Sequence, residues 1–420
     1  MTTVFERLVG QSAVVAELRQ AAAAAWHAAA ALNAPNDADL LGLDVAPVSE
    51  APQSRASMTH AWLFTGPPGS GRSVAAKCFA AALQCQTPDE LGCGHCHACT
   101  TVMAGTHGDV RHIVPEGLSL PVKLMREVVA TAARRPSTGR WQVVIVEDAD
   151  RLTEGAANAL LKMVEEPPPR TVFLLCAPSI DPEDIAVTLR SRCRHVALTV
   201  PSVDAIAAVL TERDAVEETT ARWAASVSGG HVGRARRLAT DPDARRARMD
   251  ALGLARAATA ESTAYAAAEA LVAAADAAAK AISAELDEPE REELRTALGA
   301  GGTGKGAAGA LRGSAGIIKD LEKRQKSRTT RMSRDTLDLA LVDLAALFRD
   351  GLAASYASPV AMMHPDMSKQ SADMGAYARP EELLECIEAV LECREVLGLN
   401  VKPRFAVDAM VARIGAALAH

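Results

Sequence analysis

A glycine-rich loop, GPPGSGRS at residues 66–73, has the residue types that bind phosphate groups in proteins. In such loops the glycines let backbone N–H groups face the phosphates, a lysine reaches the β- and γ-phosphates, and a serine or threonine binds Mg²⁺. Most of these requirements are met, by Gly66, Gly69, Gly71 and Ser73. Arg72, however, stands where the lysine is expected, and its wide, planar guanidinium does not fit the slot of an ammonium group. The loop therefore predicts a degenerate nucleotide site, which leaves ATP binding open and argues against turnover.

Two acidic residues lie near the end of a second apolar segment, WQVVIVEDAD at residues 141–150. At the usual partner strand of a phosphate-binding loop, an aspartate holds Mg²⁺ and a following glutamate orients the attacking water. Here the order is reversed, with Glu147 before Asp148. A displacement of about 1 Å can lower a rate about 100-fold. We therefore expect the charge of a nucleotide site with the wrong geometry for hydrolysis, and the alternative is a pair of solvated acids at a strand end.

Four cysteines within the segment CQTPDELGCGHCHAC form a candidate metal site. Their spacing is C-x7-C-x2-C-x2-C, and they are Cys85, Cys93, Cys96 and Cys99. Zn²⁺ binds four thiolates in a closed tetrahedral site of structural type. We predict a zinc knuckle over residues 85–99, in which His95 or His97 could replace a thiolate, and the alternative is a set of free surface thiols.

A basic segment, LRSRCRHVAL at residues 189–198, contains Ser191 and Arg192. An arginine exposed beside a nucleotide-binding fold can enter a neighbour's active site and neutralise the charge that develops on the γ-phosphate. From spacing alone, a surface arginine that pairs with acidic groups is the commoner outcome.

Short apolar segments and helical stretches alternate around these motifs. The segments 61–65, 141–150 and 171–178 are expected to be buried strands, which favours a parallel α/β sheet with crossover helices. From about residue 203 the pattern is helical throughout.

The composition agrees with a helix-rich protein of several domains. The chain has 420 residues, of which 49% are hydrophobic but only 3% aromatic. A net charge of −7 argues against a dedicated nucleic-acid binder. No apolar segment approaches the roughly 18 residues that span a bilayer, and the first residues lack the apolar segment of a signal peptide. We therefore expect a cytoplasmic location and no contact with a membrane.

Several of these segments together resemble one family. They are FERLVGQ near the start, the glycine loop, the four-cysteine knuckle, LTEGAANALLKMVEEPPPRTVFLL and LRSRC. The chain resembles bacterial clamp-loader subunits, which are AAA+ proteins of the DNA polymerase III holoenzyme, over residues 4–24 and 58–240 and more weakly over 332–420. The resemblance implies an AAA+ core (1–202) with the zinc knuckle, a small helical lid (203–242) and an all-α collar (243–420). The segments 33–57 and 299–332 are insertions that we expect to be flexible, and we assign no function to them.

The family contains motor subunits, gamma or tau, and a catalytically silent partner, delta-prime. The resemblance implies that a motor has lysine at position 72, Asp-Glu at 147–148, a polar residue after the third strand and an arginine at the start of the lid helix. This chain departs from all four, with Arg72, the pair Glu147-Asp148, Pro178 and Gly233. The departures indicate the silent class.

What the chain keeps from the family defines its expected role. Arg192 of the SRC motif would be an arginine finger that acts on a neighbouring motor subunit. The expected partners are gamma/tau and delta in a hetero-pentameric ring, which handles the sliding clamp and primed DNA as a complex. The alternatives are an active motor ATPase in which Arg72 replaces lysine, and a zinc-dependent nucleic-acid binder that uses the basic segment 319–334.

Overall fold

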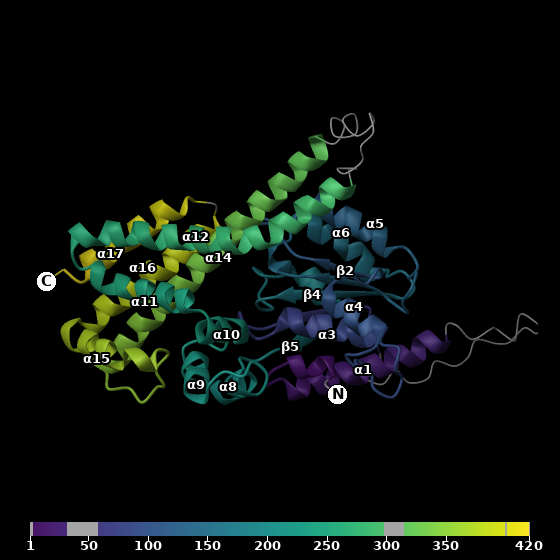
Figure 1. The fold of residues 1–420 in the computed structure, drawn as a ribbon, viewed down its shortest axis with the longest axis horizontal. Coiled ribbons are helices and arrows are strands. Elements are labelled where there is room, and N and C mark those ends of the chain that lie inside the picture. The colour runs from purple at the N-terminus through teal and green to yellow at the C-terminus, as the bar shows by residue number, and fades with distance from the viewer. Residues whose placement is uncertain (1–2, 32–57, 298–314, 400, 420) are drawn as a thin grey trace, which may run out of the picture. The chain divides into compact units, whose positions relative to one another are not determined.

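The computed structural model describes residues 3–31, 58–297, 315–399 and 401–419. Figure 1 shows the helices and strands of these residues. The chain forms two compact units, of which the first comprises residues 1–115, 119–214 and 230–233 and the second residues 116–118, 215–229 and 234–420. The expected insertion at 33–57 lies outside the described residues, and the predicted boundaries at 202 and 242 stay predictions.

A five-stranded parallel sheet forms the centre of the first unit, in the order β2-β3-β4-β1-β5. Its three middle strands are those that the sequence predicted, namely β1 (Ala61–Thr65), β3 (Gln142–Val146) and β4 (Thr171–Ala177). All residues of these strands are buried, as expected for a parallel sheet covered on both faces. The edge strands β2 (Val110–Ile113) and β5 (Arg194–Ala197) were not predicted, because they are short, partly exposed and carry charged residues.

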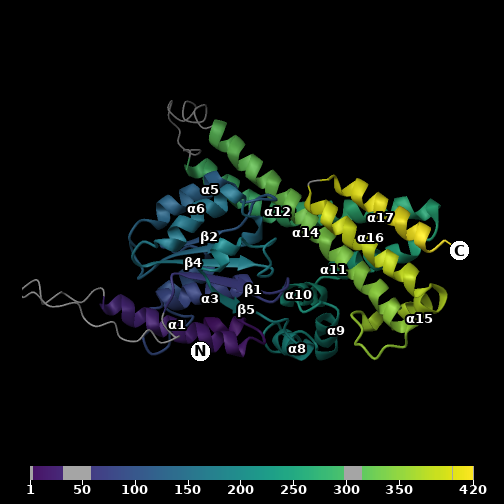
Figure 2. The ribbon, with the colours of Figure 1, turned by 180° about the vertical axis from the view of Figure 1, so that it is seen from behind.

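Helices cover both faces of this sheet (Figures 1 and 2). On one face lie α1 (Ser12–Ala31), α3 (Arg72–Gln84) and α4 (His97–Ala104), and on the other α5 (Val122–Ala132) and α6 (Glu154–Glu165). Successive residues of a strand point to opposite faces. Accordingly Trp62 and Phe64 of β1 join the α3 side, whereas Ala61 and Leu63 join the α6 side. The predicted α/β class is therefore confirmed.

The carboxyl ends of the middle strands meet at one edge of the sheet, which is where ligands bind in open parallel sheets. The glycine loop follows β1, the two acids follow β3, and Pro178 follows β4. The backbone N–H of Gly66 donates to the carbonyl of Pro178 at 3.1 Å, so the loop after β1 is tied to the end of β4.

Among the described residues of the second unit, every regular element is a helix. Its elements include α9 (Glu218–Ser226), α11 (Pro242–Ala257), α12 (Glu261–Ala297), α14 (Ala315–Ser355), η3 (Pro365–Met367), α15 (Ser368–Tyr377), α16 (Pro380–Gly398) and α17 (Pro403–Ala417). A core of large apolar side chains, including Leu344, Phe348 and Val390, holds α11, α12, α14, α16 and α17 together. Among the described residues, no helix is both long enough and apolar enough to span a bilayer.

One expectation about this unit needs correction. We expected residues 299–332 to be a flexible linker, but residues 315–332 form the first part of α14. The reason is pairing with α12: Leu321 and Gln325 are buried, and Nε2 of Gln325 donates to the carbonyl of Asp287 at 3.1 Å. The remainder of the predicted linker, up to residue 314, lies outside the described residues.

Candidate functional site: a degenerate nucleotide site, an exposed arginine and a cysteine cluster

The glycine loop adopts the backbone conformations that its sequence predicts. Gly69 and Gly71 have φ angles of 86° and 95°, which side-chain-bearing residues rarely adopt, and Gly71 is the N-cap of α3. Ser70 between them is buried, and its carbonyl accepts a hydrogen bond from Nε2 of Gln11 at 3.3 Å. The loop is therefore a formed and anchored structure that ends at the start of a helix.

Arg72 is the first residue of α3, and its Nη1 atom is buried without a hydrogen-bond partner among the described residues. Its charge acts on Asp150 at the end of the acidic segment. Burial raises the pKa of Asp150, the charge of Asp148 adds to this rise, and Arg72 opposes it. Arg72 thus extends toward the carboxyl edge of the sheet, and an unpartnered guanidinium nitrogen there keeps phosphate binding open.

Glu147 is already engaged by groups of the protein itself. His112 of β2 donates from Nε2 to Oε1 of Glu147 at 2.5 Å. Burial would raise the pKa of Glu147, but the hydrogen bond and charge of His112 outweigh it, with further contributions from Lys77 and the Ser73 hydroxyl, so the pKa lies below its ordinary value. Ser73 and Glu147 are the two side chains that would hold Mg²⁺ at an active loop, and here the carboxylate of Glu147 has His112 as its partner. His112 was not predicted from the sequence, because nothing in its spacing links it to the loop.

Asp148 has a left-handed backbone conformation, with φ of 47°. Its carboxylate lies 3.9 Å from Nε of Arg151, one turn further along the chain. An active site needs the acid at this position to reach an attacking water. The carboxylate of Asp148 is instead placed beside a cation of its own segment.

The start of α10 (Val232–Thr240) lies against the glycine loop. A Cβ atom built on Gly69 would come within 2.6 Å of Cα and Cβ of His231, so the two residues are in close contact. Gly233 offers no cation at the place where a motor subunit is expected to carry its lid arginine. The next residue, Arg234, forms a buried ion pair with Asp343 of α14. The sequence did not predict the contact of His231, which depends on the tertiary fold.

Arg192 follows the short helix α7 (Val187–Arg190) and remains half-exposed. Its Nη2 atom lies 2.7 Å from Oε1 of Glu165, and its Nη1 atom donates to the carbonyl of Thr188 at 2.9 Å. Ser191, also named from the sequence, caps α7 and donates from its hydroxyl to the same carbonyl at 3.1 Å. The sequence did not identify Glu165 as the partner of Arg192.

The structure brings the four predicted cysteines together. The Sγ atoms of Cys85, Cys93, Cys96 and Cys99 all lie within 4.8 Å of one another. Those of Cys85 and Cys96 are 3.9 Å apart, close to the separation of about 3.8 Å expected for two thiolates at about 2.3 Å from a tetrahedral Zn²⁺. The backbone N–H groups of Cys96 and Cys99 each point at the sulfur three residues earlier, at 3.4 Å. These donors stabilise thiolates, so the donor set fits a tetrahedral metal ion.

The cluster is part of the core of the first unit rather than a surface appendage. Cys85, Cys93 and Cys99 are buried, in the same apolar cluster as Val4 and Phe5 of η1 (Val4–Arg7). Gly92 inside the knuckle accepts a hydrogen bond from the Val4 N–H at 2.9 Å. The alternative of free surface thiols is thereby contradicted, and a four-cysteine group is available for a metal ion.

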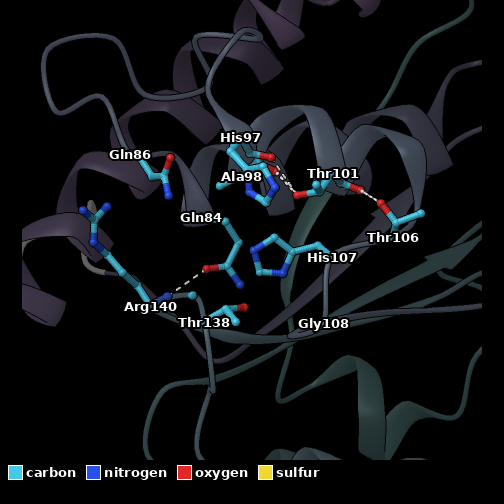
Figure 3. Close-up of a pocket in the computed structure, with 11 residues that line it drawn as sticks. Gln84, Gln86, His97, Ala98, Thr101, Thr106, His107, Gly108, Thr138 and Arg140 are labelled. Atoms are coloured by element: carbon cyan, nitrogen blue, oxygen red, sulfur yellow. Dashed lines mark hydrogen bonds between the residues drawn. The ribbon is translucent and has the colours of Figure 1, made fainter.

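A pocket of about 360 Å³ lies beside the knuckle and was not predicted (Figure 3). His97 of α4 and His107 line it together with the side chain of Gln84, which accepts from the Arg140 N–H at 2.9 Å. Asp109 holds Thr138 and Gly139 of the lining in place, because its carboxylate accepts hydrogen bonds from the backbone N–H groups of residues 137–139. The cysteine cluster contains neither His95, whose Nδ1 contacts the carbonyl of Cys93, nor His97.

A comparison with family models matches the part of the chain that contains the glycine loop, the cysteine cluster and Arg192. Residues 49–202 match the family model described as DNA polymerase III, delta subunit. In this region the chain is homologous to the delta' subunit of DNA polymerase III. The Pseudomonas aeruginosa delta' subunit is 37% identical over 193 residues, which are 44% of this chain and 57% of that protein. The Escherichia coli delta' subunit is 41% identical over 145 residues, or 34% of this chain and 43% of that protein.

These matches confirm the resemblance seen in the sequence, but they are partial. The chain spans about half the length of the delta' proteins that it matches. The tau subunit of Bacillus subtilis is also 36% identical over 138 residues, which are 33% of this chain and 24% of that protein. Because identity to delta' and to tau is similar, the choice between the two classes depends on individual residues of the nucleotide site.

Proposed function

We propose that this chain is the delta' subunit of a DNA polymerase III clamp loader and that it does not hydrolyse ATP itself. The homology of residues 49–202 supports a clamp-loader subunit. The observation that carries the silent assignment is the contact between His112 and Glu147. It supplies Glu147 with an internal partner, while Arg72 takes the place of the catalytic lysine.

In this proposal the chain contributes to hydrolysis in a neighbouring subunit through Arg192. The guanidinium is half-exposed at the surface of the first unit, just after the short helix α7, which the buried Leu189 anchors in the core. A guanidinium that is presented in this way can stabilise the charge that develops on a γ-phosphate across an interface. Ser191 supports the end of α7 beside it.

The remaining parts follow the family plan. The first unit is an AAA+ core, the helices after residue 203 form a lid, and the helical second unit forms a collar that joins a hetero-pentameric ring with gamma/tau and delta. The ring as a whole would place the sliding clamp on primed DNA in the cytoplasm. The four cysteines would hold Zn²⁺ as a closed structural site, which cross-links the knuckle without taking part in a reaction.

The alternative is an active motor of the gamma/tau class, and one pair of assays separates the two. If the chain is silent, the purified chain does not turn over ATP, whereas Arg192→Ala strongly lowers hydrolysis by the ring reconstituted with its motor subunits. If the chain is a motor, it hydrolyses ATP alone and Arg72→Lys changes the rate little. Normal hydrolysis by a ring that carries Arg192→Ala would overturn the finger assignment.

A further inference from the structure

The guanidinium of Arg192 is held from two sides. Nη1 donates to the carbonyl of Thr188 at 2.9 Å and approaches the Ser191 hydroxyl at 3.3 Å, both within its own segment. Nη2 lies 2.7 Å from Oε1 of Glu165, which comes from a different helix. Glu165 therefore provides the long-range contact that orients this side chain.

The local sequence fixes where Glu165 lies. It is the last residue of α6, and Glu166 after it leaves the helical conformation because a proline follows at position 167. Leu160 and Val164 bury the end of α6 in the core, and Leu189 buries α7 in the same cluster. Glu165 at the end of α6 and Arg192 just after α7 are thus both held in place by helices packed in this cluster.

The ion pair between Arg192 and Glu165 is weak enough for Arg192 to exchange Glu165 for another anionic partner. Both side chains are 40% exposed, and ion pairs between exposed groups are weak. Contacts of arginine with phosphate are charge-assisted and can be bidentate, so they compete well with such a pair. A neighbour's γ-phosphate could therefore replace Glu165 at Nη2 while Thr188 still holds Nη1.

We propose that Glu165 is a positioning residue for Arg192, which keeps the guanidinium in one orientation before the neighbour's nucleotide arrives. This inference rests on the proposed function of Arg192 as a finger. Without Glu165, only the contacts with its own segment would hold the arginine, so it would sample more rotamers and fewer encounters would have the reactive geometry. Its loss should slow the chemical step at the neighbouring site and leave ATP binding there unchanged.

The test uses the ring reconstituted with its motor subunits and measures the steady-state rate of phosphate release over a range of ATP concentrations. We expect Glu165→Gln to lower kcat about fivefold with KM for ATP unchanged, because only the orientation of the finger is lost. Glu165→Asp should recover part of the rate. The matched control is Glu166→Gln, which makes the same charge change at the neighbouring exposed residue and should leave kcat unchanged. Arg192→Ala is measured in parallel.

The results for the two variants separate the positioning role of Glu165 from the finger role of Arg192. If Arg192→Ala slows release but Glu165→Gln does not, or speeds it, the positioning role is overturned and the finger stands. If Arg192→Ala has no effect, the finger fails and the positioning role fails with it. An independent measurement on the full chain is the NMR order parameter of the Arg192 Nε–H group, which should fall in Glu165→Gln and remain unchanged in Glu166→Gln.

Discussion

His112 and Glu147 form a hydrogen bond of 2.5 Å at the carboxyl edge of the sheet, between β2 and the segment after β3. This contact gives the acid that would hold Mg²⁺ in a motor subunit a partner from within the chain. It stabilises the carboxylate in a partly buried place, and it has consequences for the stability of the fold.

We expect His112→Ala to lower the free energy of unfolding by about 2 kcal/mol at pH 5, because a hydrogen bond to a charged group is lost. The pKa of Glu147 is lower in the folded chain than in the unfolded chain. Its contribution to stability is therefore complete above a pH of about 4.3 and is lost as the pH falls through the folded pKa. Urea denaturation at pH 5 and pH 3 should show the difference between wild type and variant shrinking. A difference that grows toward pH 3 would contradict this assignment.

The contact between Gly69 and His231 predicts a strong effect of a single methyl group. At Gly69 a Cβ would meet the Cα and side chain of His231 at 2.6 Å, in addition to the cost of a positive φ. Gly105 has a similar φ of 77°, but apart from its chain neighbours no described residue has an atom within 4 Å of the same position. Gly105→Ala should therefore cost about 1 kcal/mol, whereas Gly69→Ala should cost about 3 kcal/mol. Equal losses in urea denaturation would mean that His231 does not press on the loop.

The ion pair of Arg234 with Asp343 is buried, with side-chain exposures of 12% and 4%. Removal of one partner leaves a buried charge, so Arg234→Ala should lower the free energy of unfolding of the second unit by about 3 kcal/mol. Arg237 on the same helix pairs with Asp241 at 3.8 Å in an exposed position. Arg237→Ala should change stability by no more than about 0.5 kcal/mol. Thermal or urea denaturation of both variants checks the comparison, and a mild effect of Arg234→Ala would refute the buried pair.

The cysteine cluster predicts a bound metal ion that stabilises the first unit. Wild-type protein should contain one equivalent of zinc by elemental analysis, and Cys96→Ser should lose it together with several degrees of melting temperature. Cys393→Ser serves as the control, because this buried cysteine of the second unit lies outside the cluster and its loss should leave the metal content unchanged. Purified wild type without metal, and with the melting temperature of Cys96→Ser, would refute a structural site.

The sequence alone was sufficient to predict those strands and candidate sites whose residues are close neighbours in the chain. The fully apolar strands β1, β3 and β4 can be recognised because both faces of a parallel strand are buried. The glycine loop and the four cysteines could be predicted because each lies in a short segment whose residue types are typical of one kind of ligand site, for phosphate or for a metal ion. The edge strands β2 and β5 escaped because their partial burial leaves no clear pattern in four residues.

What the sequence determined is therefore the α/β class, the glycine loop with Arg72, the cluster of four cysteines and the exposed Arg192, since each depends on residues that are neighbours in the chain. The partners of these groups were decided only by the tertiary structure. His112 meets Glu147 across two paired strands, Glu165 meets Arg192 between two helices, and His231 meets Gly69 across 162 positions of the sequence. Contacts of this kind arise from how helices pack on the sheet, and no spacing between two residues in the chain encodes them.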